Sequence, residues 1–358
     1  MKTSKIEKEI FEILHNNPEV SGHEIVTRKI IIEFLNKISN FYVIYNGVEG
    51  IVVGNCESAT SFDIGYRAEL DAMKLQSGEV FHGCGHDAHV TSLLVFINYV
   101  SRIDTNKKIM MIFQSSEEFG NGASKLVNIM ENLHIHINNI FSVHNDPGLW
   151  PESVAVSQGK ILATNFSNVI TINFVSKGAH FDSSLQSEVN GIKKTMEILD
   201  EVRSKIGNNF VLQIGRVKTN GSYSSKSDKL EFVLSMRSIH YSNEILKKVL
   251  KIIIQKIRSI DDVAGIGVKN IINHDRIYNS KELCNIILDS DSFFKFPINS
   301  AWSSDDFQNY SLISDRICYF FLGSYTKDRN MLHSDNLLIN PKFIVNAMYL
   351  YLFILKRV

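Results

Sequence analysis

Short apolar runs alternate with amphipathic helical patterns through much of this 358-residue chain, and the alternation limits the folds open to it. Strand candidates that are apolar throughout lie at 109–113, 140–143 and 317–322, with helical patterns at 123–130 and from 343 to the end. Apolar strands separated by helices predict a mainly parallel sheet covered by helices. We therefore expect an α/β fold in which the carboxyl ends of several strands meet at one edge.

The middle of the chain has a different pattern. Its strand candidates lie at 169–175, 211–217, 230–236 and 266–272, and its helical patterns lie at 189–202 and 245–257, with Ser242 as a candidate N-cap. The order βαββαβ is the ferredoxin-like unit. We predict an α+β domain at 166–272, inserted into a catalytic domain made of 1–165 and 273–358. At about 150 residues per domain, the length agrees with two domains.

Composition argues against several classes of partner. The chain has 38 basic and 38 acidic side chains, so it lacks the positive field expected of a protein that binds nucleic acid or an anionic membrane. The apolar stretch 347–355 is far shorter than the roughly 20 residues that cross a bilayer. Charged residues interrupt the first twelve positions, so we expect no signal peptide and a cytoplasmic location. Scattered cysteines then predict no disulfide framework.

The densest cluster of metal-binding residue types spans residues 82–89, His-Gly-Cys-Gly-His-Asp-Ala-His. The glycines allow the backbone to turn so that Cys84 and His86 point at one centre. Thiolate and imidazole ligands suit zinc or a related first-row metal. Two other readings stay open: a core cysteine beside surface histidines, and a cysteine nucleophile paired with His86 or His89.

Carboxylates and further histidines follow other predicted strands. Glu117 and Glu118 come directly after the strand at 109–113, where one could bind metal while the other acts as general base. His144 ends the strand at 140–143, and His333 lies beyond the strand at 317–322. Taken singly, the glutamates fit a solvated surface pair and the histidines fit surface positions.

Together these residues predict a metal centre with five protein ligands: Cys84, His86, Glu118, His144 and His333. A single tetrahedral catalytic zinc uses three protein ligands and keeps one position open. Five ligands therefore fit two divalent ions better than one. The thiolate favours zinc, while manganese, cobalt and nickel remain alternatives.

The chain resembles the M20 family of metallopeptidases, in particular the amidohydrolase branch with hippurate hydrolases and auxin-conjugate hydrolases. The matching segments run in the family's order over nearly the whole chain. They are 66–73 (YRAELDAM), 82–89 (HGCGHDAH), 113–118 with Gly122 and Ala123, 177–180 (KGAH), Arg237, 304–307 (SDDF) and 333–334 (HS). The resemblance implies a catalytic domain that holds two metals and an inserted lid that often mediates dimerisation.

The resemblance also implies roles for single residues. It assigns the five ligands named above and makes Glu117 the general base. Asp71 would lie near the metals and orient a ligand, although a surface turn is its alternative. His180 would reach the substrate carbonyl and stabilise the oxyanion, with a loop residue as its alternative. Arg237 resembles a lid arginine, for which a surface salt bridge fits as well as a substrate contact.

Five segments depart from the family pattern, and none of them removes a ligand or the base. Lys74 follows a segment that usually continues with proline, and Asp305 and Asp335 replace a glutamate and a proline. The lid segments 181–185 and 223–226 also differ. Because these positions are expected to shape the pocket, we expect the departures to bear on which substrate binds and on the geometry of the dimer.

We expect a dinuclear metal-dependent hydrolase that cleaves the amide bond of an N-acyl amino acid or related small conjugate. The expected protein is a homodimer through the lid domain, with no nucleic-acid or membrane partner. One alternative is a dipeptidase or aminopeptidase that uses the same centre. The other is a family member without catalytic activity that binds a conjugate.

Overall fold

The computed structural model describes residues 5–75, 77–175, 187–222, 227–298, 302–327, 331–334 and 337–358. The chain divides into two compact units. Unit 1 comprises Met1–Ile161, Ile277–Asn299 and Asp305–Val358, and unit 2 comprises Leu162–Arg276 and Ser300–Ser304. Most of unit 2 is the single long stretch Leu162–Arg276, to which the short stretch Ser300–Ser304 is added.

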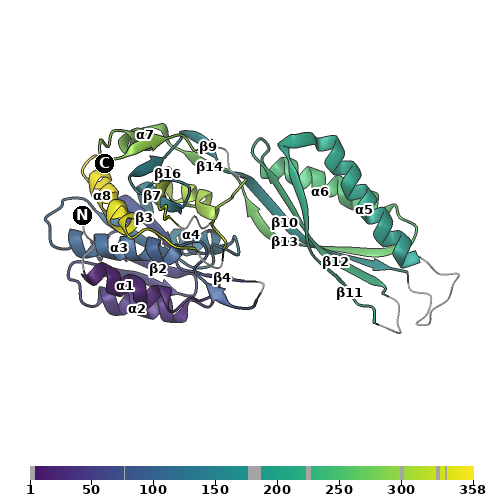
Figure 1. Ribbon diagram of the computed structural model, residues 1–358, viewed down its shortest axis with the longest axis horizontal. Coiled ribbons are helices and arrows are strands. Elements are labelled where there is room, and N and C mark those ends of the chain that lie inside the picture. Colours follow the sequence, from purple (N-terminus) through teal and green to yellow (C-terminus); the bar gives the residue numbers. More distant parts are fainter. Residues whose placement is uncertain are drawn as a thin grey trace. The chain divides into compact units, whose positions relative to one another are not determined.

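Among the described residues, unit 1 contains an eight-stranded sheet of order β1-β2-β6-β3-β7-β16-β8-β15 (Figure 1). Its strands are β1 (Tyr42–Gly47), β2 (Gly50–Gly54), β3 (Ser61–Glu69), β6 (Ile109–Gln114), β7 (His136–Asp146), β8 (Ser153–Ala155), β15 (Phe294–Phe296) and β16 (Ser314–Gly323). The central strands β6, β3, β7 and β16 are all parallel, while β1, β2 and β8 join antiparallel. The predicted α/β fold with a mainly parallel sheet is confirmed.

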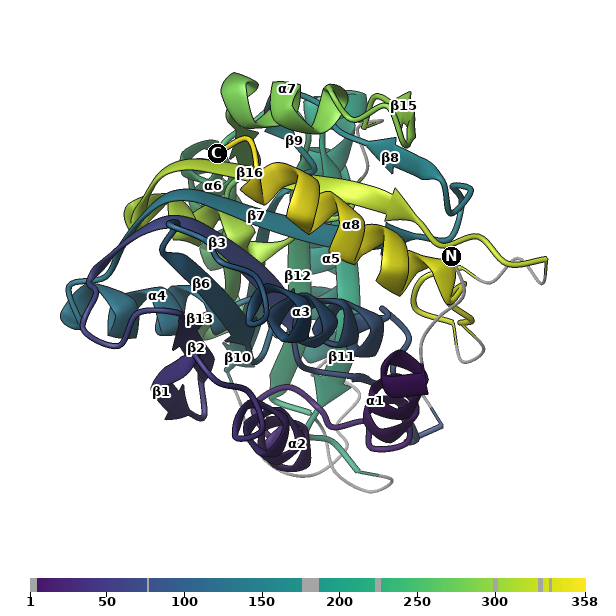
Figure 2. The same ribbon diagram turned by 90° about the vertical axis from the view of Figure 1, so that its left-hand side faces the viewer.

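Helices cover both faces of this sheet. The helices are α1 (Lys5–His15), α2 (Ile25–Leu35), α3 (His86–Val100), α4 (Gly122–Asn132), α7 (Lys281–Leu288) and α8 (Lys342–Leu355), with a 3₁₀ segment η2 (Asp306–Leu312). Figure 2 shows α3 and α8 in front of the sheet. Tyr66 of β3 packs on Phe96 of α3 and Tyr351 of α8, with ring centroids 5.0 and 4.8 Å apart. Because side chains alternate along a strand, the next residue, Arg67, points to the opposite face, toward η2.

Two short pairs of strands complete unit 1. They are β4 (Met73–Lys74) with β5 (Val80–Phe81), and β9 (Gly159–Ile161) with β14 (Ile277–Asn279). The β9–β14 pair joins the two stretches of unit 1 that flank the insertion, which brings the ends of unit 2 together.

Unit 2 has the element order βαββαβ that the sequence predicts. Its elements are β10 (Thr164–Phe174), α5 (Ser187–Ile206), η1 (Gly207–Asn209), β11 (Val211–Thr219), β12 (Lys229–Ser238), α6 (Asn243–Arg258) and β13 (Val263–His274). In its described part the strands form an antiparallel four-stranded sheet of order β11-β12-β10-β13. Side chains of β10, β12, α5 and α6 share one apolar core.

Local chemistry explains two details of unit 2. Gly191 of α5 lies directly over the ring of Phe174 in β10, a position that leaves no room for a Cβ, so the helix packs closely on the strand. Ser242 is the N-cap residue of α6, as predicted, but its side chain makes no capping hydrogen bond. The Asn243 N–H instead donates to Asp275 Oδ1 at 2.9 Å. A carboxylate from beyond β13 therefore satisfies this helix end.

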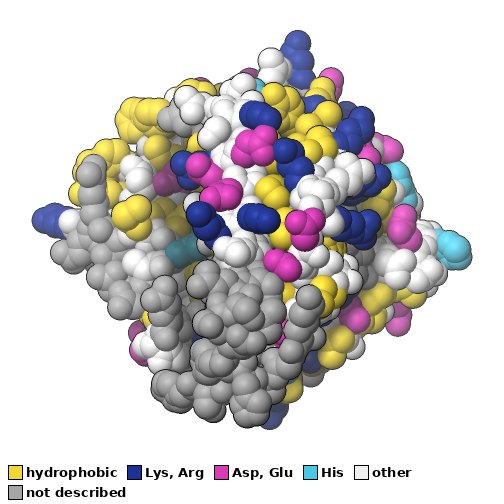
Figure 3. All heavy atoms as spheres, turned by 90° about the vertical axis from the view of Figure 1, so that its right-hand side faces the viewer, with side chains coloured by type: hydrophobic (Ala, Val, Ile, Leu, Met, Phe, Trp, Pro, Cys, Tyr) yellow, Lys and Arg dark blue, Asp and Glu magenta, His cyan; other side chains and the backbone are white. Residues whose placement is uncertain are grey.

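The outer surface of unit 2 mixes both signs of charge. Lys205 and Lys256 both contact Glu201, at 2.5 and 2.8 Å, and Lys193 lies 3.8 Å from Glu197. Figure 3 shows basic, acidic and hydrophobic side chains interspersed over the face that it presents. Among the described residues of the whole chain, no helix combines the length and apolarity needed to cross a membrane.

Candidate metal centre

The candidate site lies at the carboxyl edge of the parallel strands of unit 1. β3 ends at Glu69, β6 at Gln114, β7 at Asp146 and β16 at Gly323. His144 lies among the last residues of β7, and Asp71, Glu117, Glu118 and His333 follow the ends of β3, β6 and β16. The site is therefore assembled by the order of the strands, from residues more than 200 positions apart in the chain.

Cys84, His86 and His144 form one group in which ligand atoms of all three lie within 4.8 Å of one another. Cys84 Sγ is 3.4 Å from His144 Nε2. The turn into α3 depends on Gly85, whose φ of +84° is a left-handed value that other residues rarely adopt. A Cβ at Gly85 would also lie 2.8 Å from the Asn145 side-chain oxygen.

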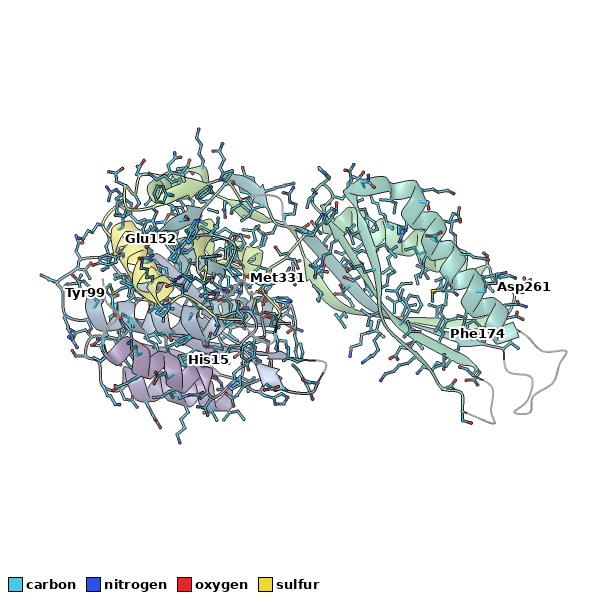
Figure 4. All side chains as sticks on the ribbon, in the orientation of Figure 1. His15, Tyr99, Glu152, Phe174, Asp261 and Met331 are labelled. Carbon is cyan, nitrogen blue, oxygen red and sulfur yellow. The ribbon has the colours of Figure 1, made fainter. Side chains whose placement is uncertain are left out.

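Cys84 also belongs to a second group, with Glu118 and His333. Its Sγ is 3.7 Å from His333 Nε2, and the His333 N–H donates to the carbonyl oxygen of Gly83 at 2.7 Å. His333 has a φ of +65°, so its backbone is held in an uncommon conformation. Met331, labelled in Figure 4, is exposed on the same segment.

A third group contains His86, Glu117 and Glu118. Glu117 Oε2 is 4.0 Å from His86 Nε2, and the Glu117 side chain is 11% exposed. The three groups overlap at Cys84, His86 and Glu118. The structure therefore brings the five predicted ligands and the predicted base into one cluster.

Asp71 lies beside His86. The Nδ1 atom of His86 is 2.8 Å from the carbonyl oxygen of Asp71 and 3.3 Å from its Oδ1. Asp71 Oδ2 accepts hydrogen bonds from Ser21 Oγ at 2.5 Å and from the Glu118 N–H at 2.9 Å. Asp71 thus contacts one predicted ligand, His86, and the backbone of another, Glu118. Because Nδ1 of His86 faces Asp71, Nε2 is the ring nitrogen of His86 that is left for a metal.

Burial strongly affects the titration of this cluster. It raises the pKa of Cys84 well above its usual value, and the charges of Glu118 and Glu117 add to the effect. The pKa of Glu117 is also far above normal, through burial and then repulsion from Asp305 and Glu118. Burial lowers the pKa of His86, but the Asp71 hydrogen bond and nearby carboxylates outweigh it and raise the value to about 10.

These shifts, with the unpaired atoms of the site, fit a divalent cation. The buried atoms His86 Nε2 and Glu118 Oε1 have no hydrogen-bond partner among the described residues. Such unpaired atoms are costly unless something else binds them. Repulsion among Glu117, Glu118 and Asp71 calls for compensating positive charge, and the set of thiolate, imidazole and carboxylate is one that zinc accepts.

The hydrogen bond that holds the turn before Glu117 and Glu118 was not predicted from the sequence. Glu24, at the start of α2, is 1% exposed, and its Oε1 accepts the Ser116 N–H at 2.8 Å. Ser116 has a φ of +60°, so this bond holds a strained turn directly before Glu117. The sequence carried no signal for Glu24, because its partner Ser116 lies 92 positions away in the chain.

Several predicted positions lie outside the described residues. They are His180, Asp335 and the segments 181–185 and 223–226. Arg237 is described within unit 2. Its Nη1 donates to the Trp302 carbonyl oxygen at 2.7 Å, and its Nε has no partner among the described residues. Lys74 is exposed on β4, and Asp305 is buried against Arg67.

Comparison with known proteins gives similar chains along almost the full length. An uncharacterized hydrolase of Staphylococcus aureus is 24% identical over 371 residues, covering 94% of each chain. The hippurate hydrolase of Campylobacter jejuni is 23% identical over 363 residues, covering 94% of this chain and 92% of its own. The Bacillus subtilis YxeP protein, a dinuclear metal-binding peptidase from the M20 family, superposes with a TM-score of 0.74 at 18% identity, covering 98% of this chain and 96% of its own.

The family comparison covers most of the chain, including the five predicted ligands and Glu117. The model of peptidase family M20/M25/M40 matches residues 66–357. This span begins in β3, before Asp71, and ends after α8. The chain therefore belongs to peptidase family M20/M25/M40 and is a metal-dependent hydrolase.

Proposed function

We propose that the protein is a dinuclear metallohydrolase that cleaves the amide bond of an N-acyl amino acid or a related small conjugate, releasing a carboxylic acid and an amine. The observation that carries this proposal is the overlap of three ligand groups at Cys84, His86 and Glu118. The resemblance to a hippurate hydrolase supports an N-acylated amino acid as the substrate class.

In this proposal five residues hold the two ions: Cys84, His86, Glu118, His144 and His333. Cys84 and Glu118 belong to the group with His333, and Cys84 and His86 belong to the group with His144. The thiolate favours zinc, and manganese, cobalt or nickel are the alternatives. Asp71 orients His86 through its contact with Nδ1.

The reaction needs a nucleophile, a base and a stabilised oxyanion. Divalent metals, when bound, would supply the nucleophile, because they lower the pKa of a bound water to about 7. Glu117 is the proposed base: its Oε2 lies 4.0 Å from Nε2 of the proposed ligand His86, and the proposal assigns it no metal, so it is free to take up a proton and return it to the leaving nitrogen. His180 is the proposed donor to the oxyanion.

A substitution at Glu117 tests this role. Glu117→Gln keeps the size and polarity of the side chain but removes the base, so it should retain metal and lose about 100- to 10,000-fold in kcat. Glu131→Gln, an exposed position on α4, is the control. The measurement is hydrolysis of a panel of N-acyl amino acids, together with metal content. Full activity of Glu117→Gln would contradict the assignment.

We also propose a cytoplasmic homodimer joined through unit 2, acting as a lid and dimerisation domain. All four cysteines are free, which suits a reducing compartment. The edge strands β11 and β13 carry the exposed apolar residues Val217 and Val268, at 51% and 45% exposure. Sedimentation analysis should give a dimer for the wild type and a monomer for Val217→Lys with Val268→Lys; a monomeric wild type would refute the dimer.

A further inference from the structure

Arg67 is the most deeply buried cation in the candidate site. Its side chain is fully buried on β3, and each nitrogen of its guanidinium donates to at least one acceptor. Nη1 donates to Glu69, and Nη1 and Nη2 donate to the two carboxylate oxygens of Asp305 at 3.3 and 3.2 Å. Nη2 also donates to Asp306 at 3.0 Å, and Nε to the side-chain oxygen of Gln114 at 3.0 Å.

One chain of contacts runs from Arg67 to the metal-ligand candidate His144. Glu69 Oε2 accepts from His89 Nδ1 at 2.8 Å, since a carboxylate only accepts. His89 Nε2 lies 2.8 Å from the side-chain oxygen of Asn145 and 3.1 Å from its backbone nitrogen. The Asn145 carbonyl accepts from His144 Nδ1 at 2.8 Å, which leaves Nε2 of His144 directed at Cys84.

A second chain of contacts runs from Arg67 to the loop that carries both glutamates. The carboxylate of Asp306 accepts from Gln114 Nε2 at 2.9 and 3.1 Å, directly before this loop. Asp306 Oδ2 also accepts the Ala123 N–H at 2.8 Å, directly after it. The loop that holds Glu117 is thus fixed at both ends by one carboxylate, which is itself held by Arg67.

We propose that Arg67 is a positioning residue that holds both halves of the candidate metal centre, His144 through Glu69 and the Glu117 loop through Asp306. The inference rests on the metal centre of the proposed function. A planar guanidinium with five donors can serve these acceptors at once, whereas a lysine ammonium cannot. The buried ion cluster around Arg67 contacts the metal-ligand side through His89 and the glutamate loop through Gln114 and Ala123, which a role in folding alone does not explain.

The test compares zinc binding by the whole metal-stripped chain in the wild type and in Arg67→Lys, measured by competition with a chromophoric chelator. Loss of support around metal ligands typically costs about 10- to 100-fold in affinity, and we expect a loss of this size. Tyr66→Phe is the matched control: it removes a buried hydrogen bond to Tyr351 from the adjacent residue of β3, on the other face of the sheet. It should lower Tm and leave zinc affinity within about twofold.

A second variant covers the case in which Arg67→Lys does not fold. Glu69→Gln keeps the volume of the side chain and removes the charge that both Arg67 and His89 contact, while Asp306 and its contacts with the Glu117 loop stay in place, so it should also weaken zinc binding by about tenfold or more. Where turnover is measurable, kcat of either variant should fall with KM nearly unchanged. A folded variant that binds zinc like the wild type overturns the inference. A wild type that binds no zinc contradicts the proposed function instead.

Discussion

Cys84 Sγ lies 3.4 Å from Nε2 of His144, although the two residues are 60 positions apart. The contact forms because the turn before α3 and the end of β7 meet at the carboxyl edge of the sheet. Both residues are buried, each 7% exposed. A buried thiol against a buried imidazole is a pair that a soft metal ion would bind.

Removing this thiol should weaken metal binding. Cys84→Ser replaces a soft sulfur ligand by a hydroxyl, so we expect fewer than two zinc ions per chain after gel filtration and a loss of affinity of at least about tenfold. Cys56→Ser is the control, because Cys56 has no predicted ligand role. Elemental analysis of the purified variants is the measurement, and an unchanged zinc content for Cys84→Ser would remove it from the ligand set.

The substrate class can be separated from a dipeptidase by one comparison. An N-acetyl dipeptide and the same dipeptide with a free amino group differ only in the ammonium charge. A buried ammonium without an acidic partner loses at least about 1–3 kcal/mol, so the acetylated compound should have a kcat/KM about tenfold higher or more. Liquid chromatography of the released amine gives both rates. The reverse preference would favour the dipeptidase or aminopeptidase.

A pair outside the ligand set gives the chain a pH-dependent stability. His15 Nδ1 on α1, labelled in Figure 4, lies 2.6 Å from Asp87 Oδ2. This hydrogen bond raises the pKa of His15 above 6.5, although burial opposes the shift. A raised folded pKa means that the folded chain holds the proton more tightly. The stabilisation is therefore complete below 6.5 and is lost as pH rises through the folded pKa.

The corresponding measurement is urea unfolding of the metal-stripped wild type and His15→Gln. The wild type should be more stable than the variant at about pH 5.5, and the difference should shrink by about pH 8.5. Phe11, Phe81 and His82 also pack around His15, and burial lowers the pKa of His82, so the negative charge that we assign to the shift is that of Asp87. A difference that stayed constant with pH would exclude the ion pair.

The fold was predictable because its strands differ so much in pattern. All six residues of β6 are buried, which matches the apolar run at 109–113, whereas β12 alternates between buried and half-buried positions. These two patterns distinguish a strand covered on both faces from one covered on a single face. The antiparallel additions β1 and β2 were not predicted, since their short runs with glycines resemble loops.

The candidate site was predictable only where residue type and position both pointed to metal. Cys84 and His86 stood out by spacing, and Glu118 by its place after an apolar strand. Arg67 and Glu24 did not, because their effect depends on acceptors and donors that lie far away in sequence, such as Asp305 and Ser116. Such long-range contacts leave no periodic or local signal.

Metal titration of the stripped chain tests the central claim most directly. Zinc is added in steps to the wild type, and both bound metal and the hydrolysis of an N-acyl amino acid are followed. The dinuclear account predicts that binding saturates at two ions per chain and that activity reaches its maximum only as the second site fills. Saturation of both binding and activity at one ion per chain, or full hydrolysis by the stripped chain, would contradict it.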